Sequence, residues 1–223
     1  MSSRRSPGRA ISWIGAALCA WLLLLGPPSA AGEPRIVVLG DSLTAGFGLP
    51  REDAFPAGLE AALRAEGHAW QVIDAGVSGD TSAGGLARLD WVLADSPEIV
   101  IVELGANDGL RGLPTDQMEA NLDAILVGIG ESSATTLLAG MRAPANFGAD
   151  YAAAFRAVYE RLAARHRVAL YPFFLEGVAL KPALNQPDGI HPNAAGVAEI
   201  VRRILPHVVA LTARHKGGQG EGK

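Results

Sequence analysis

The sequence predicts a single α/β domain, built on a parallel sheet that carries helices on both faces. Strand-like and helix-like segments alternate from residue 35 to residue 208, an order typical of consecutive βα units. The segment 99–104 is a predominantly apolar run, as expected for a strand that is covered on both faces. No stretch between these segments has the composition of a linker, so one domain accounts for the pattern.

Five segments are predicted as strands, and helices are predicted between them and after the last. The strands are 35–39, 70–74, 99–104, 136–139 and 168–171. Asp53 is a candidate cap for the first helix, with Pro56 in its first turn. The helices are indicated by apolar residues at helical spacing: Phe55, Leu59 and Leu63; Leu86, Leu89, Val92 and Leu93; Met118, Leu122, Ile125, Leu126 and Ile129; Tyr151, Phe155, Val158, Tyr159 and Leu162; and Val197, Ile200, Val201, Ile204, Leu205 and Val208.

Residues 1–31 have the layout of a secretory signal peptide. Three arginines precede an apolar run over 10–26, two prolines end that run, and small residues at 29–31 offer a cleavage site after Ala31. The alternative is an uncleaved membrane anchor, because the run is near the lower length limit for spanning a bilayer. Arg4-Arg5 is only a weak indication of twin-arginine export. Cleavage predicts a periplasmic or secreted protein without a stable membrane span.

The composition of the remaining chain excludes several function classes. The full chain of 223 residues has 49% hydrophobic residues and a net charge of −4, which does not favour nucleic acid as a partner. The only cysteine, Cys19, lies within the predicted signal peptide, so the mature chain has no thiol nucleophile, disulfide or cysteine metal site. The folded domain is predicted over 32–215, followed by a glycine-rich disordered tail over 216–223.

Unusual residues follow the first three predicted strands. These turns are Gly40-Asp41-Ser42, 76–81 and 105–109, and each contains glycine, which lets the backbone approach a ligand closely. In a parallel sheet the three turns lie at one edge, where ligands collect. A fourth segment, 188–193, precedes the last helix and places Asp188 three residues before His191.

These four segments together fit nucleophilic catalysis. A serine hydroxyl needs a base to take its proton, and a carboxylate can orient that base. The hypothesis assigns Ser42 as nucleophile, His191 as general base and then acid, and Asp188 as the orienting carboxylate. The candidate donors to an oxyanion are the backbone N–H groups of Ser42 and Gly79 and the side-chain amide of Asn107.

Each residue alone also has a structural interpretation. Ser42 could cap a helix, any one histidine is more often structural, and Asn107-Asp108-Gly109 could be a simple turn. Asp80 and Asp108 are interpreted as turn or capping acids. A non-catalytic module that binds an anion at the turn after the first strand would leave the Asp188–His191 pair unexplained.

The motifs resemble those of the SGNH (GDSL-type) hydrolases, with the four letters on Ser42, Gly79, Asn107 and His191. Within that family, the chain is similar to the bacterial periplasmic enzymes of the thioesterase, lysophospholipase and arylesterase type. The matching stretches follow the family's order: 40–43, 78–82, 85–89, 102–105, 107–112, Arg142, 144–146, 172–174 and 188–193.

The resemblance implies a flavodoxin-like three-layer α/β/α sandwich with a five-stranded parallel sheet and no cofactor or metal. It implies hydrolysis of esters and thioesters through an acyl-enzyme on Ser42, with small acyl esters, thioesters and lysophospholipids as candidate substrates. It carries Ser42, Asp188 and His191 into the catalytic triad, and Ser42, Gly79 and Asn107 into the oxyanion hole. A carbohydrate acetylesterase of the same fold is the enzymatic alternative.

Apolar residues near the motifs are candidates for holding the acyl chain. They are Leu110, Leu113, Met141 and Phe147, and their alternative role is packing. Ala143 departs from the larger aliphatic residue that the resemblance leads us to expect between Arg142 and Pro144, which could alter chain-length preference. Activity is expected to fall below about pH 6.5, where an ordinary histidine becomes protonated.

Overall fold

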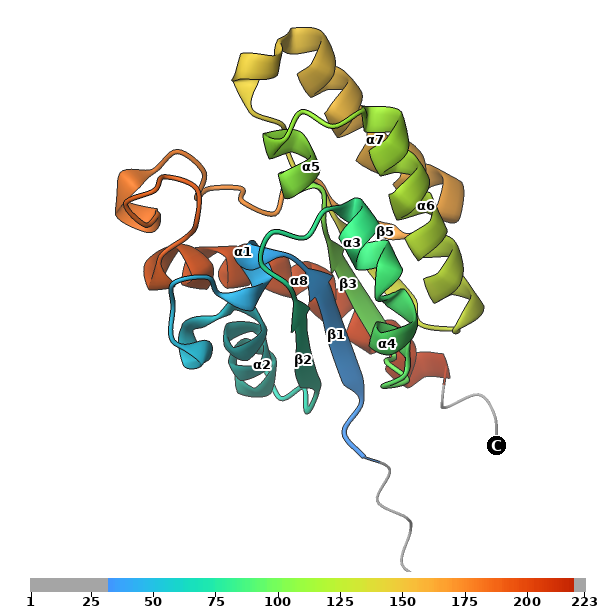
Figure 1. Ribbon diagram of the computed structural model, residues 1–223. Coiled ribbons are helices and arrows are strands. Elements are labelled where there is room, and N and C mark those ends of the chain that lie inside the picture. Colours follow the sequence, from blue (N-terminus) through green and yellow to red (C-terminus); the bar gives the residue numbers. More distant parts are fainter. Residues whose placement is uncertain (1–31, 219–223) are drawn as a thin grey trace, which may run out of the picture. The chain divides into compact units, whose positions relative to one another are not determined.

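The computed structural model describes residues 32–218, and its centre is a five-stranded parallel sheet (Figure 1). The strands are β1 (Arg35–Gly40), β2 (Gln71–Gly76), β3 (Ile99–Glu103), β4 (Thr135–Ala139) and β5 (Ala169–Tyr171). Their order across the sheet is β2-β1-β3-β4-β5, and every pairing is parallel. The order reverses direction between β1 and β3, and in such sheets the crevice beyond the carboxyl ends at the reversal is where ligands bind.

Helices cover both faces of this sheet. The α-helices are α1 (Ser42–Ala45), α2 (Phe55–Ala65), α3 (Ser82–Ala87), α4 (Leu89–Leu93), α5 (Ala106–Leu110), α6 (Thr115–Glu131), α7 (Ala149–His166) and α8 (Ala194–Gly218). Three short 3₁₀ helices lie in loops: η2 (Arg51–Asp53), η3 (Ala145–Phe147) and η4 (Pro182–Leu184). Helices α2 and α8 pack together on one face, and α3, α6 and α7 pack together on the other (Figure 1). The predicted α/β fold with a five-stranded parallel sheet is confirmed.

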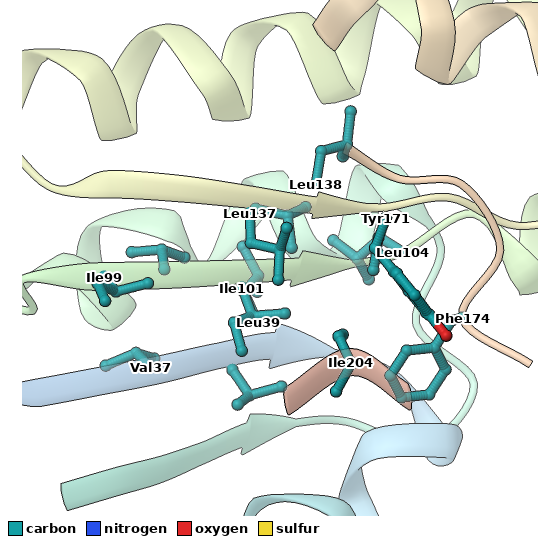
Figure 2. Packing of buried hydrophobic residues seen from close by; sticks show 14 of the residues in the cluster. Val37, Leu39, Ile99, Ile101, Leu104, Leu137, Leu138, Tyr171, Phe174 and Ile204 are labelled. Carbon is teal, nitrogen blue, oxygen red and sulfur yellow. The ribbon is translucent and has the colours of Figure 1, made fainter. Parts of the chain in front are cut away.

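The core lies between the sheet and these two helical layers. Apart from the exposed first residues Arg35 and Thr135, the side chains of β1, β3 and β4 are buried on both faces, in agreement with the mainly apolar composition of those strands. Figure 2 shows Val37 and Leu39 of β1, Ile99 and Ile101 of β3 and Ile204 of α8, all members of this core. The carboxyl ends of β1 and β3 are therefore held in place by a close-packed core.

Several predicted boundaries differ from the observed ones. Asp53 is not the cap of α2: it lies in η2, and Ala54 precedes α2 without a side-chain cap. The predicted second helix is divided into α3 and α4 at Arg88, whose guanidinium donates to the carbonyls of Gly40 and Ala75. Trp70 is fully buried but precedes β2.

The predictions for the two ends of the chain concern segments that lie wholly or partly outside the described residues. The signal-peptide interpretation of residues 1–31 concerns a segment outside them. Helix α8 continues to Gly218, into the segment that the sequence predicts as a disordered tail, and residues 219–223 lie outside the described part. Residues 216–218 are thus helical, and the predicted domain boundary and tail stay predictions.

Two glycine substitutions in helices are expected to have opposite effects on stability. A Cβ on Gly196, in the first turn of α8, would overlap the carbonyl oxygen of Leu184 in the loop that leads to His191. We expect Gly196→Ala to lower the free energy of unfolding by about 1–3 kcal/mol, because a backbone atom must move. Gly130→Ala in α6 meets no atom within 4 Å and should raise it by about 0.5–1 kcal/mol. Urea unfolding of both variants measures the difference, and equal stabilities would contradict the packing described for α8.

Candidate active site

The turn after β1 is organised by the buried carboxylate of Asp41. Its Oδ1 accepts a hydrogen bond from the Leu43 N–H at 2.9 Å, which makes Asp41 the N-cap of α1. Ser42 is the first residue of α1, so the interpretation of Ser42 as a cap is wrong: Asp41 already has that role. The helix ends after one turn at Gly46, whose φ of 72° lies in the left-handed region. This arrangement leaves the half-buried Ser42 at the carboxyl edge of the sheet.

A continuous chain of hydrogen bonds joins Ser42 to His191 and Asp188. The His191 Nε2 lies 2.9 Å from the Ser42 Oγ, and the His191 Nδ1 lies 2.7 Å from the Asp188 Oδ2. An ionised carboxylate can only accept, so His191 donates through Nδ1 and its Nε2 is free to accept the serine proton. The three residues that the sequence predicts as a triad are thus brought together from two loops 146 residues apart at their nearest.

Asp188 is fixed by more than its histidine. Its Oδ1 also accepts the backbone N–H groups of Ile190 and His191, at 2.9 and 3.0 Å. The hydrogen bond from the His191 side chain, followed by those backbone donors, lowers the pKa of Asp188 to about 2. The carboxylate therefore stays ionised throughout the pH range in which a histidine titrates.

The position of His191 depends on contacts that the sequence analysis missed. The Gln186 N–H donates to the His191 carbonyl at 2.7 Å, and the Gln186 side chain donates to the carbonyls of Phe47 and Pro192. The Phe47 ring packs against the imidazole, with their centroids 4.6 Å apart. Gln186 lies within the loop that carries the Asp188–His191 motif, but Phe47 is distant in sequence, so no local pattern signals its contact with the imidazole.

The side-chain amide of Asn107, in α5, lies between the turns after β1 and β2. Its Nδ2 donates to the Asp41 Oδ2 at 3.0 Å and to the Asp80 carbonyl at 2.9 Å. Both amide protons are therefore engaged, and donation to an oxyanion requires that one of these hydrogen bonds be shared or exchanged. Gly79, next to Asp80, is exposed with a φ of 86°, and its carbonyl accepts from Arg111 at 2.8 Å.

Asp80 and Asp108, which the sequence suggests as turn or capping acids, each link their own turn to another part of the chain. Asp80 pairs with Arg88 at 2.7 Å, and the same guanidinium reaches the ends of β1 and β2. Asp108 is buried and accepts from both the backbone N–H and the hydroxyl of Ser82, at 2.8 and 2.6 Å. These contacts hold the Gly79 turn and the start of α3 against the sheet.

A cleft of about 200 Å³ opens beside Ser42 and His191. Of the predicted acyl-binding residues, Leu110 and Met141 line it, whereas Leu113 and Phe147 do not. Phe147 instead packs against Tyr151, with ring centroids 5.4 Å apart, and the Leu113 carbonyl accepts from the Tyr151 hydroxyl. The lining is completed by Asp41, Leu43, Ala106, Asn107, Arg142, Pro144, Leu175, Ala179, Leu180, Asn185, Gly189 and Ile190, without Ala143.

Two kinds of feature are absent from the described residues. Among them, no group of three or more His, Cys, Asp or Glu side chains is arranged to hold a metal ion. Within residues 32–218, no helix is long and apolar enough to cross a membrane.

The ionisation of Asp188 offers a direct test of the His191 contact. We expect the Asp188 carboxylate, followed by ¹³C NMR, to remain ionised at pH 4 in the wild type and to become partly protonated in His191→Ala. Because the folded pKa lies below the ordinary value of 3.8, the stability that this pair contributes is complete above that value and is lost as the pH falls towards about 2. Glu199, whose pKa the adjacent Arg202 and Arg203 lower to about 2, is the internal control and should not change. An unchanged Asp188 titration in the variant would contradict the pairing.

Comparison with known proteins agrees with this geometry. Residues 38–198 match the GDSL-like Lipase/Acylhydrolase family. Esterase TesA of Pseudomonas aeruginosa is 42% identical over 194 residues, which cover 86% of this chain and 96% of the relative. The thioesterase 1/protease 1/lysophospholipase L1 of Escherichia coli strain K12 is 46% identical over 169 residues, which cover 74% of this chain and 78% of the relative.

A solved structure shows the same similarity in three dimensions. The psychrotrophic esterase EstA from Pseudoalteromonas sp., in a form inhibited by monoethylphosphonate, is 33% identical with a TM-score of 0.75, and the match covers 80% of this chain and 100% of that one. With a family match along most of the sequence and relatives above 40% identity, the chain belongs to the GDSL-like lipase/acylhydrolase family, the SGNH hydrolases that its motifs resemble.

Proposed function

We propose that this protein hydrolyses carboxylic esters and thioesters through an acyl-enzyme on Ser42. The observation that carries the proposal is the hydrogen-bond chain from Asp188 through His191 to the Ser42 hydroxyl, at the mouth of an apolar cleft. Geometry of this kind activates a serine, because the base already accepts the hydroxyl proton and is itself oriented by a carboxylate.

In the first step, the Ser42 Oγ attacks the acyl carbonyl while its proton passes to the His191 Nε2. The imidazolium that forms is stabilised by the ionised Asp188 through Nδ1–H. The tetrahedral intermediate then collapses, the bond to the alkoxide or thiolate breaks, and the His191 Nε2–H protonates that leaving group. The products of this half-reaction are an alcohol or thiol and an ester on Ser42.

In the second step, water replaces the leaving group. His191 takes a proton from the water as its oxygen attacks the acyl carbon, and collapse of the second intermediate releases the Ser42 oxygen, which regains the proton from His191. The cycle yields one carboxylic acid and restores the starting hydrogen bonds. No step calls for a metal or a redox group.

The oxyanion in both steps needs donors already in place. The N–H of Ser42 is a candidate, because the first N–H groups of a helix have no partner within the helix. The Asn107 amide is another, and it reaches the turn that contains Gly79 through the Asp80 carbonyl. We propose Ser42, Gly79 and Asn107 as the oxyanion hole, where each donor typically contributes about 10²–10³ in rate.

The lining of the cleft supports acyl groups as the recognised part of the substrate. Leu110, Met141, Leu175, Leu180 and Ile190 present apolar surface beside the nucleophile. Relatives of this chain are named esterase, arylesterase and thioesterase 1/lysophospholipase L1, which differ in leaving group rather than in the acyl transfer itself. We therefore propose small acyl esters, thioesters and lysophospholipids as the substrate range.

Replacement of the nucleophile tests the proposal most directly. We expect Ser42→Ala to lower kcat for a short aryl ester by at least about 10⁴-fold, and to abolish labelling by a fluorophosphonate, which forms a covalent bond with an activated serine. Intact-mass analysis should show one label per chain in the wild type, and peptide mapping should place it on Ser42. Ser133→Ala, at an exposed position after α6, is the matched control and should behave as wild type. Full esterase activity in Ser42→Ala would exclude this mechanism.

We also propose that residues 1–31 are removed and that the mature enzyme works in the periplasm or outside the cell. The support is the basic, apolar and small-residue order of that segment. Expression of the full chain in a bacterium should give a periplasmic product that begins at Gly32, detected by N-terminal sequencing after osmotic shock. Ala31→Arg, which replaces the small residue before the cut with a large charged one, should accumulate uncleaved. A wild-type product that retains residue 1 in the membrane fraction would favour the anchor interpretation.

A further inference from the structure

Two carboxyl side chains are buried together beneath the nucleophile, and only one of them has been assigned a role. Asp41 and Glu103 are each 0% exposed. Glu103 is the last residue of β3 and pairs in register with Gly40, the residue before Asp41. The Asp41 N–H donates to the Glu103 Oε2 at 3.4 Å, and a Cβ on Gly40 would lie 2.9 Å from that oxygen. The pair therefore lies directly under the turn that carries Ser42.

The two acids differ in how many donors they have. Asp41 accepts a backbone N–H from Leu43 and the amide of Asn107, at 2.9 and 3.0 Å. The only N–H donor to Glu103 is that of Asp41, through the long contact, and its other hydrogen-bonding neighbour is the Asp41 carboxyl itself. The Glu103 Oε1 has no hydrogen-bond partner among the described residues. Because donors favour an ionised carboxylate, the negative charge belongs on Asp41.

The groups around the pair do not supply a second compensating charge. Tyr159 of α7 approaches this region, but its hydroxyl donates to the Leu104 carbonyl. The Arg88 guanidinium donates to Asp80 and to two backbone carbonyls. His191 faces Asp41 from the loop before α8, and Asp108 of α5 adds a further negative charge near Tyr159. Two carboxylates in such an interior cannot both be ionised at neutral pH.

The direction of the pKa changes agrees with this contact geometry. Burial raises the pKa of Glu103 well above its ordinary value, and the nearby Asp41 charge raises it further. Burial also raises the pKa of Asp41, to about 6, against the opposing effect of its hydrogen bonds from Leu43 and Asn107. These directions agree with Asp41 as the more readily ionised member of the pair.

We propose that Asp41 and Glu103 hold a single proton, located on Glu103, and that the charge kept on Asp41 fixes the amide of Asn107 with its N–H groups towards the nucleophile turn. An ionised Asp41 can only accept, and so can the Asp80 carbonyl, so Asn107 must present Nδ2 to both. Glu103 is a positioning residue in this arrangement. The effect of Glu103 on the rate of hydrolysis rests on the proposed function, whereas the protonation of Glu103 does not.

The protonation can be measured without any activity assay. We expect the infrared spectrum of the wild type at pH 7.5 to show the carbonyl band of one protonated carboxylic acid, which shifts in D₂O. The band should be absent in Glu103→Gln and unchanged in Glu131→Gln, an exposed control on α6. No band in the wild type, or its persistence in Glu103→Gln, would overturn the proposal. The wild-type spectrum decides on its own if Glu103→Gln does not fold.

The effect on Asn107 is tested by Asp41→Asn. Asparagine keeps the cap on α1, because it is as good a capping residue as aspartate. Its amide N–H₂, however, would face the Asn107 N–H₂, which forces one of the two amides to turn. We expect kcat for a short ester to fall by about 10²-fold with little change in KM, close to the loss in Asn107→Ala. Glu103→Gln, which mimics the protonated acid, should lose much less than Glu103→Ala.

A double variant separates positioning from a general structural effect. If Asp41 acts through Asn107, the combination Asp41→Asn with Asn107→Ala should lose no more kcat than Asn107→Ala alone. Losses that multiply would show that Asp41 acts independently and would overturn this part of the proposal. Failure of the proposed function is recognised separately, as full activity in Ser42→Ala, and it leaves the infrared result unaffected.

Discussion

The carboxylate of Asp41 is the interaction on which the rest of the site depends. One of its oxygens caps α1 and so sets the direction of Ser42, while the other holds the amide of Asn107. These two partners come from the turns after β1 and β3, which are neighbours only because the strand order reverses there. A single buried side chain thus links the nucleophile to a proposed oxyanion donor across the point where the sheet changes direction.

The site combines this rigid part with a more exposed one. Asp41 directly follows β1 and Asn107 lies in α5 just after β3, two strands of the buried sheet, whereas Asp188 and His191 lie on a long loop between β5 and α8. The first part of that loop is anchored in the core by Phe174 and Val178. The part next to His191 is held by polar contacts, such as those of Gln186 with the backbone of Phe47, His191 and Pro192. The position of the general base His191 therefore depends on hydrogen bonds, and the position of the nucleophile Ser42 depends on the packing of the strand before it.

Patterns along the chain could predict the sheet and the three residues of the hydrogen-bond chain. Apolar runs and helical periodicity are local patterns, and Asp188 lies three residues from His191. Both can therefore be recognised in a single sequence. The role of Arg88 could not be predicted, because it depends on carbonyls of β1 and β2 that are distant in sequence. Glu103 was likewise hidden, since an acid within an otherwise apolar strand shows its partner only when β1 and β3 pair. Leu113 and Phe147 illustrate the converse: closeness to a motif in sequence did not place them in the cleft.

A negative charge beside an oxyanion hole needs a physical reason, because it opposes the charge that develops in the transition state. Here the Asp41 carboxylate accepts hydrogen bonds from two N–H donors. These donors reduce the negative electrostatic potential that reaches the cleft, and the bond to Asn107 also fixes the orientation of that amide. A second charge on Glu103 would have only the long contact from the Asp41 N–H and would oppose the oxyanion without orienting Asn107. Keeping Glu103 neutral is thus the condition under which an acid at position 41 benefits the chemistry of Ser42. The residue that precedes the nucleophile can be acidic because the strand next to it supplies an acid that is not ionised.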